Sequence, residues 1–251
     1  MSAKPPYIVE PNGPSTSTDR PATIIFLHGY GDDAEGIPLG LAQQFQFYNK
    51  IPYVKWILPN APRNMEAMTT AWYAIKELPN PMKPRIPEHG DAEDESPDDE
   101  EGILQSTAVI DELVEQELKS GTPPDRIIVG GFSQGCAVSM VWGLIGKYRD
   151  EVAGVVCLSG YFPLAERIEQ LRRERPAVVS GEKVGKKKWF YVHGTKDMLV
   201  PTRLFTLGKE NLLKWIEVDD MEEHLYPGMG HSTASAELRD MLGFFNKVIP
   251  P

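Results

Sequence analysis

Short apolar segments alternate along the chain with longer segments of helical periodicity. The short segments are rich in β-branched and aromatic residues and are often apolar on both faces, as strands of a parallel sheet covered on both sides are. An edge strand is expected at 7–9 and a final short strand at 225–226. Between them, the pattern predicts strands over 23–27, 54–58, 127–129, 152–158 and 189–192.

Amphipathic helices are predicted between the strands. Glu100 and Glu101 suit the start of a helix, because acidic side chains stabilise a helix N-terminus. Strands that alternate with helices predict one α/β domain over residues 1–251, with a mostly parallel central sheet and helices on both faces. The apolar side of the first helix repeats through Ile103, Thr107, Ile110 and Val114, and further helices are expected over 136–145, 204–215 and 238–248.

Two segments do not fit this alternation. Residues 79–101 are proline-rich and then acidic, which is typical of an exposed loop. Residues 163–188 hold eight basic and four acidic residues. A solvated excursion is expected there, with a helix plus a loop as the alternative.

Residues 127–146 are uncharged and long enough to cross a membrane. They also contain five glycines, and their first residues, Ile127-Ile128-Val129, have the composition of a buried strand. A strand followed by a helix is therefore the expected structure. The first residues of the chain lack the apolar core of a secretory signal, so a soluble intracellular protein is expected.

Two features of the composition exclude other classes of protein. Cys136 and Cys157 both lie in apolar stretches, so buried reduced thiols are predicted and a disulfide scaffold is excluded. The formal net charge is −10, with 36 acidic and 26 basic residues. Nine of the acidic residues lie in 88–101, which leaves 27 acidic against 26 basic residues elsewhere. Binding to nucleic acid or anionic lipid is not expected unless a local basic patch supplies it.

The strongest chemical signal is the pentapeptide Gly131-Phe132-Ser133-Gln134-Gly135, between a predicted strand and a predicted helix. A Gly-x-Ser-x-Gly turn in that position is typical of a nucleophile elbow, in which the serine hydroxyl projects above the sheet. Flanking glycines let neighbouring backbone approach closely. Ser133 is therefore the candidate nucleophile, and a plain turn is the alternative.

A serine hydroxyl needs a base, and the base needs a carboxylate that fixes its tautomer. His231 lies in a glycine-framed loop before the last helix and is favoured over the other histidines, which are His28, His89, His193 and His224. Asp197 follows the strand at 189–192 and completes the chain order Ser, Asp, His of α/β-hydrolases. Asp219 and Asp220 are the rivals, but their doubled acids resemble a solvated run.

The chemistry also needs donors for an oxyanion. One is expected from the backbone N–H of Gln134, and a second from the glycine-containing loop 27–32 after an early strand. A plain glycine turn is the alternative for that loop. No cluster has metal-ligand spacing, and the reaction requires neither a metal nor a cofactor.

Five motifs in this order resemble those of the acyl-protein thioesterases, also called the phospholipase/carboxylesterase family. The likeness covers roughly residues 20–250. The motifs are residues 26–32 (Phe-Leu-His-Gly-Tyr-Gly-Asp), 58–62 (Leu-Pro-Asn-Ala-Pro), 130–135 (Gly-Gly-Phe-Ser-Gln-Gly), 193–201 (His-Gly-x-x-Asp-x-Leu-Val-Pro) and 228–232 (Gly-Met-Gly-His-Ser).

This resemblance implies an α/β-hydrolase fold, a triad of Ser133, Asp197 and His231, and oxyanion donors at Tyr30 and Gln134. It also implies hydrolysis of thioesters on S-palmitoylated proteins, with side activity on lysophospholipids and small esters. Family members are typically cytoplasmic and sometimes also nuclear, and some form homodimers.

The chain departs from the family pattern after the proline motif. The family often has Trp-Phe-Asp where this chain has Trp72-Tyr73-Ala74, without the acid. Apolar residues of this irregular segment could line an acyl channel, although an ordinary core under a loop is equally expected. The candidates for this channel are Met65, Met68, Trp72, Ile75, Leu78 and Met82.

Two other functions remain open. One is a general carboxylesterase that acts on short-chain esters, and the other is a non-catalytic hydrolase-fold module that binds an apolar ligand or partner. A chain-length series of substrates separates the first from a thioesterase, and labelling of Ser133 by a fluorophosphonate tests the second.

Overall fold

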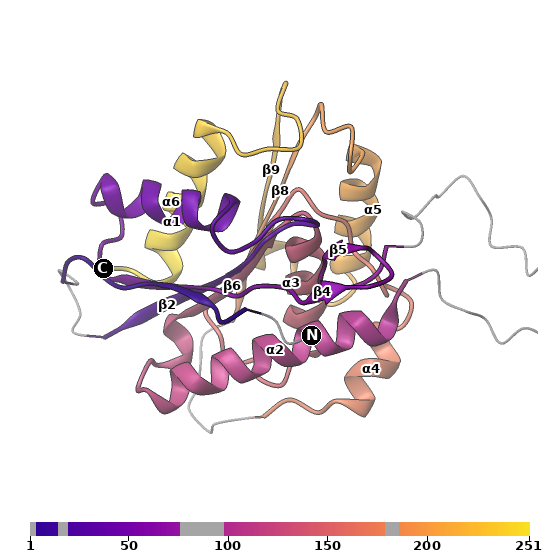
Figure 1. Ribbon diagram of the computed structural model, residues 1–251, viewed down its shortest axis with the longest axis horizontal. Coiled ribbons are helices and arrows are strands. Elements are labelled where there is room, and N and C mark those ends of the chain that lie inside the picture. The colour runs from indigo at the N-terminus through magenta and orange to yellow at the C-terminus, as the bar shows by residue number, and fades with distance from the viewer. Residues whose placement is uncertain (1–3, 15–19, 76–97, 179–185) are drawn as a thin grey trace, which may run out of the picture.

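The computed structural model describes residues 4–14, 20–75, 98–178 and 186–251 (Figure 1). Its centre is a seven-stranded sheet in the order β1-β3-β2-β6-β7-β8-β9. Only β1 runs antiparallel to its neighbour, and all the other pairs are parallel, as predicted. The strands are β1 (Tyr7–Val9), β2 (Ala22–Leu27), β3 (Val54–Leu58), β6 (Ile127–Phe132), β7 (Gly154–Leu158), β8 (Lys188–Gly194) and β9 (Met221–Tyr226), and a separate hairpin is formed by β4 (Arg63–Asn64) and β5 (Thr69–Thr70).

Helices cover both faces of the sheet. In Figure 1, α1 and α6 lie together on one side of it, and α2 and α4 lie on the other side. The core divides in the same way, into one cluster with α2, α3, α4 and α5 and another with α1 and α6. The helices are α1 (Ile37–Phe47), α2 (Glu100–Lys119), α3 (Gln134–Ile145), α4 (Ile168–Glu174), α5 (Thr202–Leu212) and α6 (Ser235–Val248), with short 3₁₀ helices at Pro124–Arg126 and Val218–Asp220.

The strand β2 shows why the central strands are apolar on both faces. Successive side chains of a strand point to opposite faces of the sheet. Ile25 and Leu27 belong to the cluster under α2 and α3, whereas Ile24 and Phe26 belong to the cluster under α1 and α6. Each of these four side chains is fully buried. A strand of a parallel sheet that is covered on both faces therefore shows no alternation of apolar and polar residues in the sequence.

Several boundaries differ from the sequence predictions. The helix α1 was not predicted, because Gly40 and three glutamines leave it only a short apolar side, which consists of Pro38, Leu41, Ala42 and Phe45. The hairpin β4–β5 was not predicted either, since each strand has only two residues. In the basic segment, the solvated excursion is wrong for 168–174, which form α4 and bury Ile168 and Leu171, so the helix of the alternative prediction is confirmed. Residues 179–185 of this segment lie outside the described residues.

The predicted acidic loop also needs correction at its end. Glu100 and Glu101 form the first turn of α2, and the Asp99 side chain caps this helix by accepting a hydrogen bond from Gly102 N. The backbone N–H of Leu164 donates to the Asp98 carboxylate at 2.8 Å. Residues 98–101 are therefore structured, and residues 76–97 lie outside the described part of the chain.

The uncharged segment 127–146 forms β6 and then α3, so the strand-and-helix prediction is confirmed. Among the helices in the described residues, none is long and apolar enough to cross a bilayer. Cys136 and Cys157 are both free and buried, as predicted.

The order of the strands determines where a site can form. The chain leaves β2 for α1 on one face of the sheet and leaves the neighbouring β6 for α3 on the other face. A crevice opens at the carboxyl ends of parallel strands where successive connections diverge in this way. The loops that follow β2, β6, β8 and β9 all emerge at this edge.

Glu117 joins α2 to the sheet and provides a test of this packing. Its buried carboxylate accepts hydrogen bonds from Thr23 Oγ1 at 2.6 Å and from Lys55 Nζ at 2.7 Å. Glu117→Ala leaves the buried Thr23 hydroxyl and the Lys55 ammonium without this partner, so we expect a loss of about 2–4 kcal/mol in the free energy of unfolding. Urea denaturation measures the loss.

The matched control is Glu112→Ala, which removes an exposed carboxylate from the same helix. We expect it to change the free energy of unfolding by no more than about 0.5 kcal/mol. Equal losses in the two variants would mean that helix propensity, and not the contact with the sheet, accounts for the effect.

Candidate active site

Ser133 occupies a strained turn between β6 and α3. Its backbone has φ 55° and ψ −114°, a conformation that residues with a side chain rarely adopt. The turn is so tight that a Cβ on Gly131 would lie 2.3 Å from the carbonyl carbon of Gly135. A Cβ on Gly135 would lie 2.4 Å from Leu27 O. Only glycine fits at either position. The serine side chain is thereby held at the carboxyl edge of the sheet, as a nucleophile elbow requires.

The three side chains predicted to work together are within hydrogen-bond distance. His231 Nε2 lies 2.9 Å from Ser133 Oγ, and His231 Nδ1 lies 2.7 Å from Asp197 Oδ2. A carboxylate only accepts hydrogen bonds, so the proton of the neutral ring is on Nδ1 and Nε2 is free to accept from the serine hydroxyl. The ring of Phe132 packs against the imidazole, with ring centroids 4.8 Å apart.

Asp197 is held rigidly at the end of β8. Its side chain is fully buried, and its Oδ1 accepts hydrogen bonds from the backbone N–H groups of Leu199 at 2.9 Å and Val200 at 2.8 Å. These donors, together with His231, supply the hydrogen bonds that a buried charge needs. Of the rival acids, Asp220 is buried beside Lys188 in the 3₁₀ helix before β9, so the prediction that it lies in a solvated run is wrong.

The loops that carry Asp197 and His231 are bonded to each other. Lys196 N donates to Met229 O at 2.9 Å, and Gly228 N donates to Thr195 Oγ1 at 3.0 Å. These hydrogen bonds fix the spacing between the carboxylate and the imidazole. The approach is so close that a Cβ on Gly194 would lie 2.3 Å from Met229 O.

The remaining histidines have other surroundings. His193 is fully buried, and its Nε2 lies 2.7 Å from Val200 O and 3.5 Å from Asp197 Oδ2, so it borders the carboxylate that His231 also contacts. Burial lowers the pKa of His193. His28 is also fully buried and bonded to backbone, whereas His224 lies on β9 beside Glu222. His89 lies outside the described residues. Within the described residues, no group of three or more His, Cys, Asp or Glu side chains could hold a metal ion.

The loop after β2 lies directly against the elbow. A Cβ on Gly29 would lie 3.3 Å from Ser133 Cβ. The backbone N–H of Tyr30 makes no hydrogen bond to another described residue, whereas the next N–H, that of Gly31, donates to Thr70 O at 2.9 Å. Gln134 opens α3, and the N–H groups of a first helical turn have no carbonyl partner within the helix. Two backbone donors, at Tyr30 and Gln134, are therefore available beside the serine.

A cavity of about 460 Å³ opens beside Ser133, Gln134 and His231. Its size is that of a small-molecule site. Ile75 is the one residue of the predicted acyl channel in the described part of the wall. The other residues that line the cavity are Gly29, Tyr30, Asp32, Ile37, Phe132, Tyr161, Leu199 and Val200.

The rest of the predicted acyl channel needs correction. Met65 and Met68 are 67% and 66% exposed, and they do not line the cavity, because they flank the turn of the β4–β5 hairpin. Trp72 is buried, with its backbone N–H bonded to Gln134 Oε1 at 2.9 Å. Leu78 and Met82 lie outside the described residues. The presence of methionines in an irregular segment does not reveal which of them face inward.

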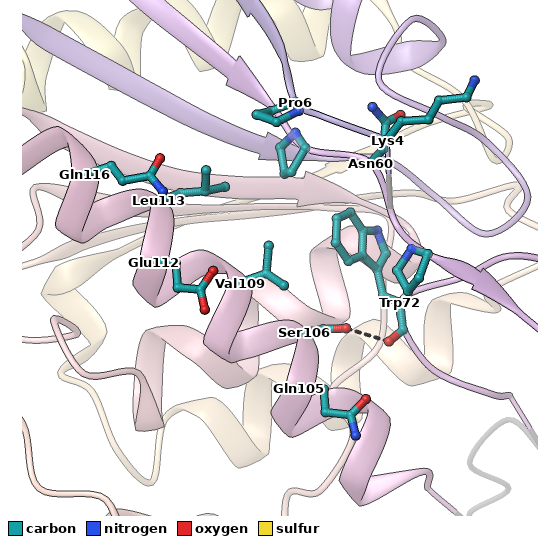
Figure 2. A pocket seen from close by; sticks show the side chains of 12 residues that line it. Lys4, Pro6, Asn60, Trp72, Gln105, Ser106, Val109, Glu112, Leu113 and Gln116 are labelled. Carbon is teal, nitrogen blue, oxygen red and sulfur yellow. Dashed lines mark hydrogen bonds between the residues drawn. The ribbon is translucent and has the colours of Figure 1, made fainter. Parts of the chain in front are cut away.

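Trp72 instead lines a second cavity of about 460 Å³, shown in Figure 2. Val109 and Leu113 of α2 face its interior, with Lys4 and Pro6 across the opening. Figure 2 also shows the hydrogen bond from Ser106 to the Trp72 carbonyl. Ser133 and His231 do not line this cavity.

Several apolar residues of the cavity wall were missed by the sequence prediction. Leu199 and Val200 follow Asp197, and Ile37 and Tyr161 come from α1 and the loop after β7. An apolar pair directly after a candidate catalytic acid, in a loop that should otherwise be polar, is a signal for the first two. No comparable signal marks Ile37 or Tyr161, because their roles depend on where α1 and the β7 loop pack.

The sheet, the elbow and the order of the three side chains define an α/β-hydrolase. The chain matches the model of the phospholipase/carboxylesterase family over residues 7–249, and it belongs to that family. The matched range includes every described residue of the candidate site.

Curated relatives and solved structures agree with this assignment. Acyl-protein thioesterase 1 of Yarrowia lipolytica is 31% identical over 237 residues, which cover 91% of this chain and 92% of the relative. Acyl-protein thioesterase 1 of Schizosaccharomyces pombe is 31% identical over 242 residues, 93% of each chain. The crystal structure of Zea mays acyl-protein thioesterase 2 has a TM-score of 0.67 at 23% identity and covers 97% of this chain and 98% of its own.

Glu237 supports the loop that carries His231 and predicts how stability depends on pH. It is fully buried on α6, its Oε2 accepts from Ala234 N at 3.3 Å, and burial raises its pKa from 4.5 to about 7. The folded state therefore binds a proton that the unfolded state has released, and stability falls as pH rises through this interval. We expect Glu237→Gln to gain up to about 3 kcal/mol in unfolding free energy relative to wild type between about pH 5 and pH 8.

Denaturant unfolding at a series of pH values checks this expectation. Glu210→Gln removes an exposed carboxylate from α5 and is the control, for which we expect no change in the pH dependence. A Glu237→Gln profile parallel to that of wild type would show that the carboxyl group does not change its protonation on unfolding.

Proposed function

We propose that the protein is a serine hydrolase that removes fatty-acyl groups from S-acylated cysteines of proteins. The observation that carries the proposal is the continuous hydrogen-bond chain from Ser133 through His231 to the buried Asp197, at 2.9 and 2.7 Å, beside an apolar cavity. Membership of the phospholipase/carboxylesterase family and the thioesterase relatives support the same chemistry. Lysophospholipids and small esters are proposed as side substrates.

In the first step, Ser133 Oγ attacks the acyl carbon and His231 Nε2 takes its proton. The resulting imidazolium is stabilised by the Asp197 carboxylate at Nδ1. Because Asp197 already accepts two backbone N–H bonds, its position does not change when the ring becomes charged. No reorganisation of the carboxylate is needed during proton transfer.

The tetrahedral intermediate places a negative charge on the former carbonyl oxygen. We propose that the backbone N–H groups of Tyr30 and Gln134 bind this oxygen. Gly29 brings the first donor close to Ser133, and the start of α3 presents the second with the positive end of its helix dipole. Both are backbone groups, which are fixed before the substrate arrives.

Collapse of the intermediate breaks the bond between the acyl carbon and sulfur. The leaving thiolate takes the proton from His231, and the acyl group stays on Ser133 as an ester. Water then enters, gives its proton to the neutral imidazole and attacks the ester. The fatty acid leaves and Ser133 regains its proton, so the cycle requires no cofactor.

The wall of the cavity favours an apolar acyl group. Ile37, Ile75, Leu199 and Val200 line it beside the serine. Each methylene buried there stabilises the bound substrate by up to about 0.8 kcal/mol. The S-acylated cysteine is recognised in this proposal mainly through its acyl chain.

Location and assembly remain part of the proposal and rest on the family resemblance alone. We expect action on S-acylated protein partners in the cytoplasm and also in the nucleus, and a homodimer is expected on the same ground.

The proposed nucleophile is tested by Ser133→Ala. We expect kcat for a palmitoyl thioester to fall on the order of 10⁴-fold or more, because attack by a hydroxyl is no longer available. Circular dichroism should match wild type, since alanine accepts the same backbone conformation at similar strain. A fluorophosphonate probe, followed by mass spectrometry, should label Ser133 in wild type and leave the variant unlabelled.

The exposed Ser235→Ala on α6 is the control and should keep wild-type activity and labelling. Near-normal turnover by Ser133→Ala would refute the proposed nucleophile. Absence of labelling in wild type would favour a non-catalytic binding module.

The acyl specificity is tested by Ile75→Ser. We expect kcat/KM of wild type to rise with acyl-chain length by at most roughly fourfold per buried methylene. Ile75→Ser should flatten this rise, because a polar side chain in the wall reduces the apolar contact that each added methylene gains. A series of thioesters of increasing chain length provides the measurement.

Met68→Ser is the matched control, because Met68 is exposed and does not line the cavity. It should retain the wild-type dependence on chain length. If kcat/KM of wild type falls steadily as the chain lengthens, the protein is better described as a carboxylesterase for short-chain esters.

A further inference from the structure

His28 lies at the end of β2 and takes no part in the proposed proton transfer. It is fully buried, and both of its ring nitrogens contact backbone atoms. Ala61 N lies 2.9 Å from His28 Nε2, and Gly29 O lies 2.7 Å from His28 Nδ1. The ring therefore connects the loop after β3 to the loop after β2.

These two contacts determine the tautomer of the ring. A backbone N–H can only donate, so His28 Nε2 must accept the hydrogen bond from Ala61. The proton of the neutral ring is then on Nδ1, which donates to the Gly29 carbonyl. Burial lowers the pKa of His28, which favours the neutral ring that this pattern requires.

The carbonyl that accepts this hydrogen bond belongs to the same peptide unit as the N–H of Tyr30. The peptide bond is planar, so an interaction that fixes its C=O also fixes the direction of its N–H. Hydrogen bonds in a chain also polarise one another, and a peptide carbonyl that accepts a hydrogen bond makes the N–H of the same peptide unit a stronger donor.

We propose that His28 is a positioning residue for the oxyanion donor at Tyr30, acting as a neutral imidazole that aligns and polarises the Gly29–Tyr30 peptide. This inference rests on the proposed function, because it assigns a role to an N–H that binds the oxyanion. It adds a side chain to the proposed reaction that touches neither the substrate nor Ser133.

Trp72 holds the other side of the His28 backbone. Its indole Nε1 donates to His28 O at 2.9 Å, and the two rings pack with centroids 5.0 Å apart. Trp72 is itself fixed through its backbone, by the Gln134 side chain and by Ser106, the latter visible in Figure 2. The histidine ring therefore has little freedom to turn away from the Gly29 carbonyl.

The tautomer can be measured on the wild-type protein without any activity assay. Long-range ¹H–¹⁵N spectra of ¹⁵N-histidine-labelled protein distinguish a ring protonated on Nδ1 from one protonated on Nε2, and the His28→Asn spectrum assigns the His28 signals by their loss. We expect the neutral Nδ1–H tautomer at neutral pH. An Nε2–H tautomer or a charged ring would overturn the proposal.

Kinetics of two variants test the consequence for the oxyanion. Asparagine places an N–H₂ group near the Nδ1 position and can still donate to Gly29 O, whereas leucine cannot. We expect His28→Leu to lower kcat about 10- to 100-fold at unchanged KM, because an oxyanion donor acts in the transition state. We expect His28→Asn to restore kcat to within about threefold of wild type. His224→Asn, on the half-buried edge strand β9, is the control and should keep wild-type kinetics.

Thermal unfolding of each variant separates this effect from a loss of folded protein. Equal loss of kcat in His28→Asn and His28→Leu, or no loss in either, would overturn the role of His28 while labelling of wild-type Ser133 by a fluorophosphonate still supports the proposed function. If His28→Leu does not fold, two other results test the role of His28. A tenfold or greater fall in kcat of His28→Asn would overturn that role, and so would an Nε2–H tautomer in wild type. A wild type that is not labelled would overturn the proposed function and this inference together.

Discussion

The structure depends on a backbone contact between the end of β2 and the start of α3. Gly135 packs so closely against the carbonyls of Leu27 and His28 that an added Cβ would lie 2.4 and 2.6 Å from their oxygens. This contact sets the distance between the first turn of α3 and the loop after β2. The backbone N–H groups of Tyr30 and Gln134, one from each side of the contact, therefore come into place together with the strained Ser133, and the proposed oxyanion site consists of backbone alone.

The second half of the site is assembled by electrostatics. A buried carboxylate costs several kcal/mol unless hydrogen bonds compensate it. Asp197 meets this requirement with two N–H groups of its own loop, which leaves its second oxygen for His231. The parallel sheet supplies the rest, because it places the ends of β8 and β9 side by side and the loops that follow them bond to each other.

The sequence predicted the part of the site that local rules control. Ser133 was placed by its glycines and by the strand and helix around it, and Asp197 and His231 were placed because each follows a predicted strand. Parallel strands end at one edge of a sheet, so residues directly after them can meet without any knowledge of packing. The central strands and the two helix-bounded faces followed from the same periodicity.

The cavity could not be predicted in the same way. Met65 and Met68 are apolar and close in sequence to Ile75, yet they lie in the loop of the β4–β5 hairpin and are exposed to solvent. Tyr161 reaches the cavity because its loop packs there. Lining a cavity depends on the direction of each side chain, which is set by tertiary contacts between segments far apart in the chain. The helix α1 was missed for the same reason, because its apolar side can be identified only once the sheet that it covers is known.

Tyr73 and Ala74, where the chain departs from the family pattern, make contacts of this kind. The Tyr73 hydroxyl is buried and donates to the Tyr161 hydroxyl at 2.9 Å, and Tyr161 lines the cavity beside Ser133. Ala74 has no carboxylate of its own, but its N–H donates to the Asp99 carboxylate at 2.8 Å. Asp99 also caps α2. The segment that ends in Ile75 is therefore fastened to the start of α2 on one side and to the loop after β7 on the other, so the wall that faces the acyl chain is held by contacts that the three residues of the motif do not encode.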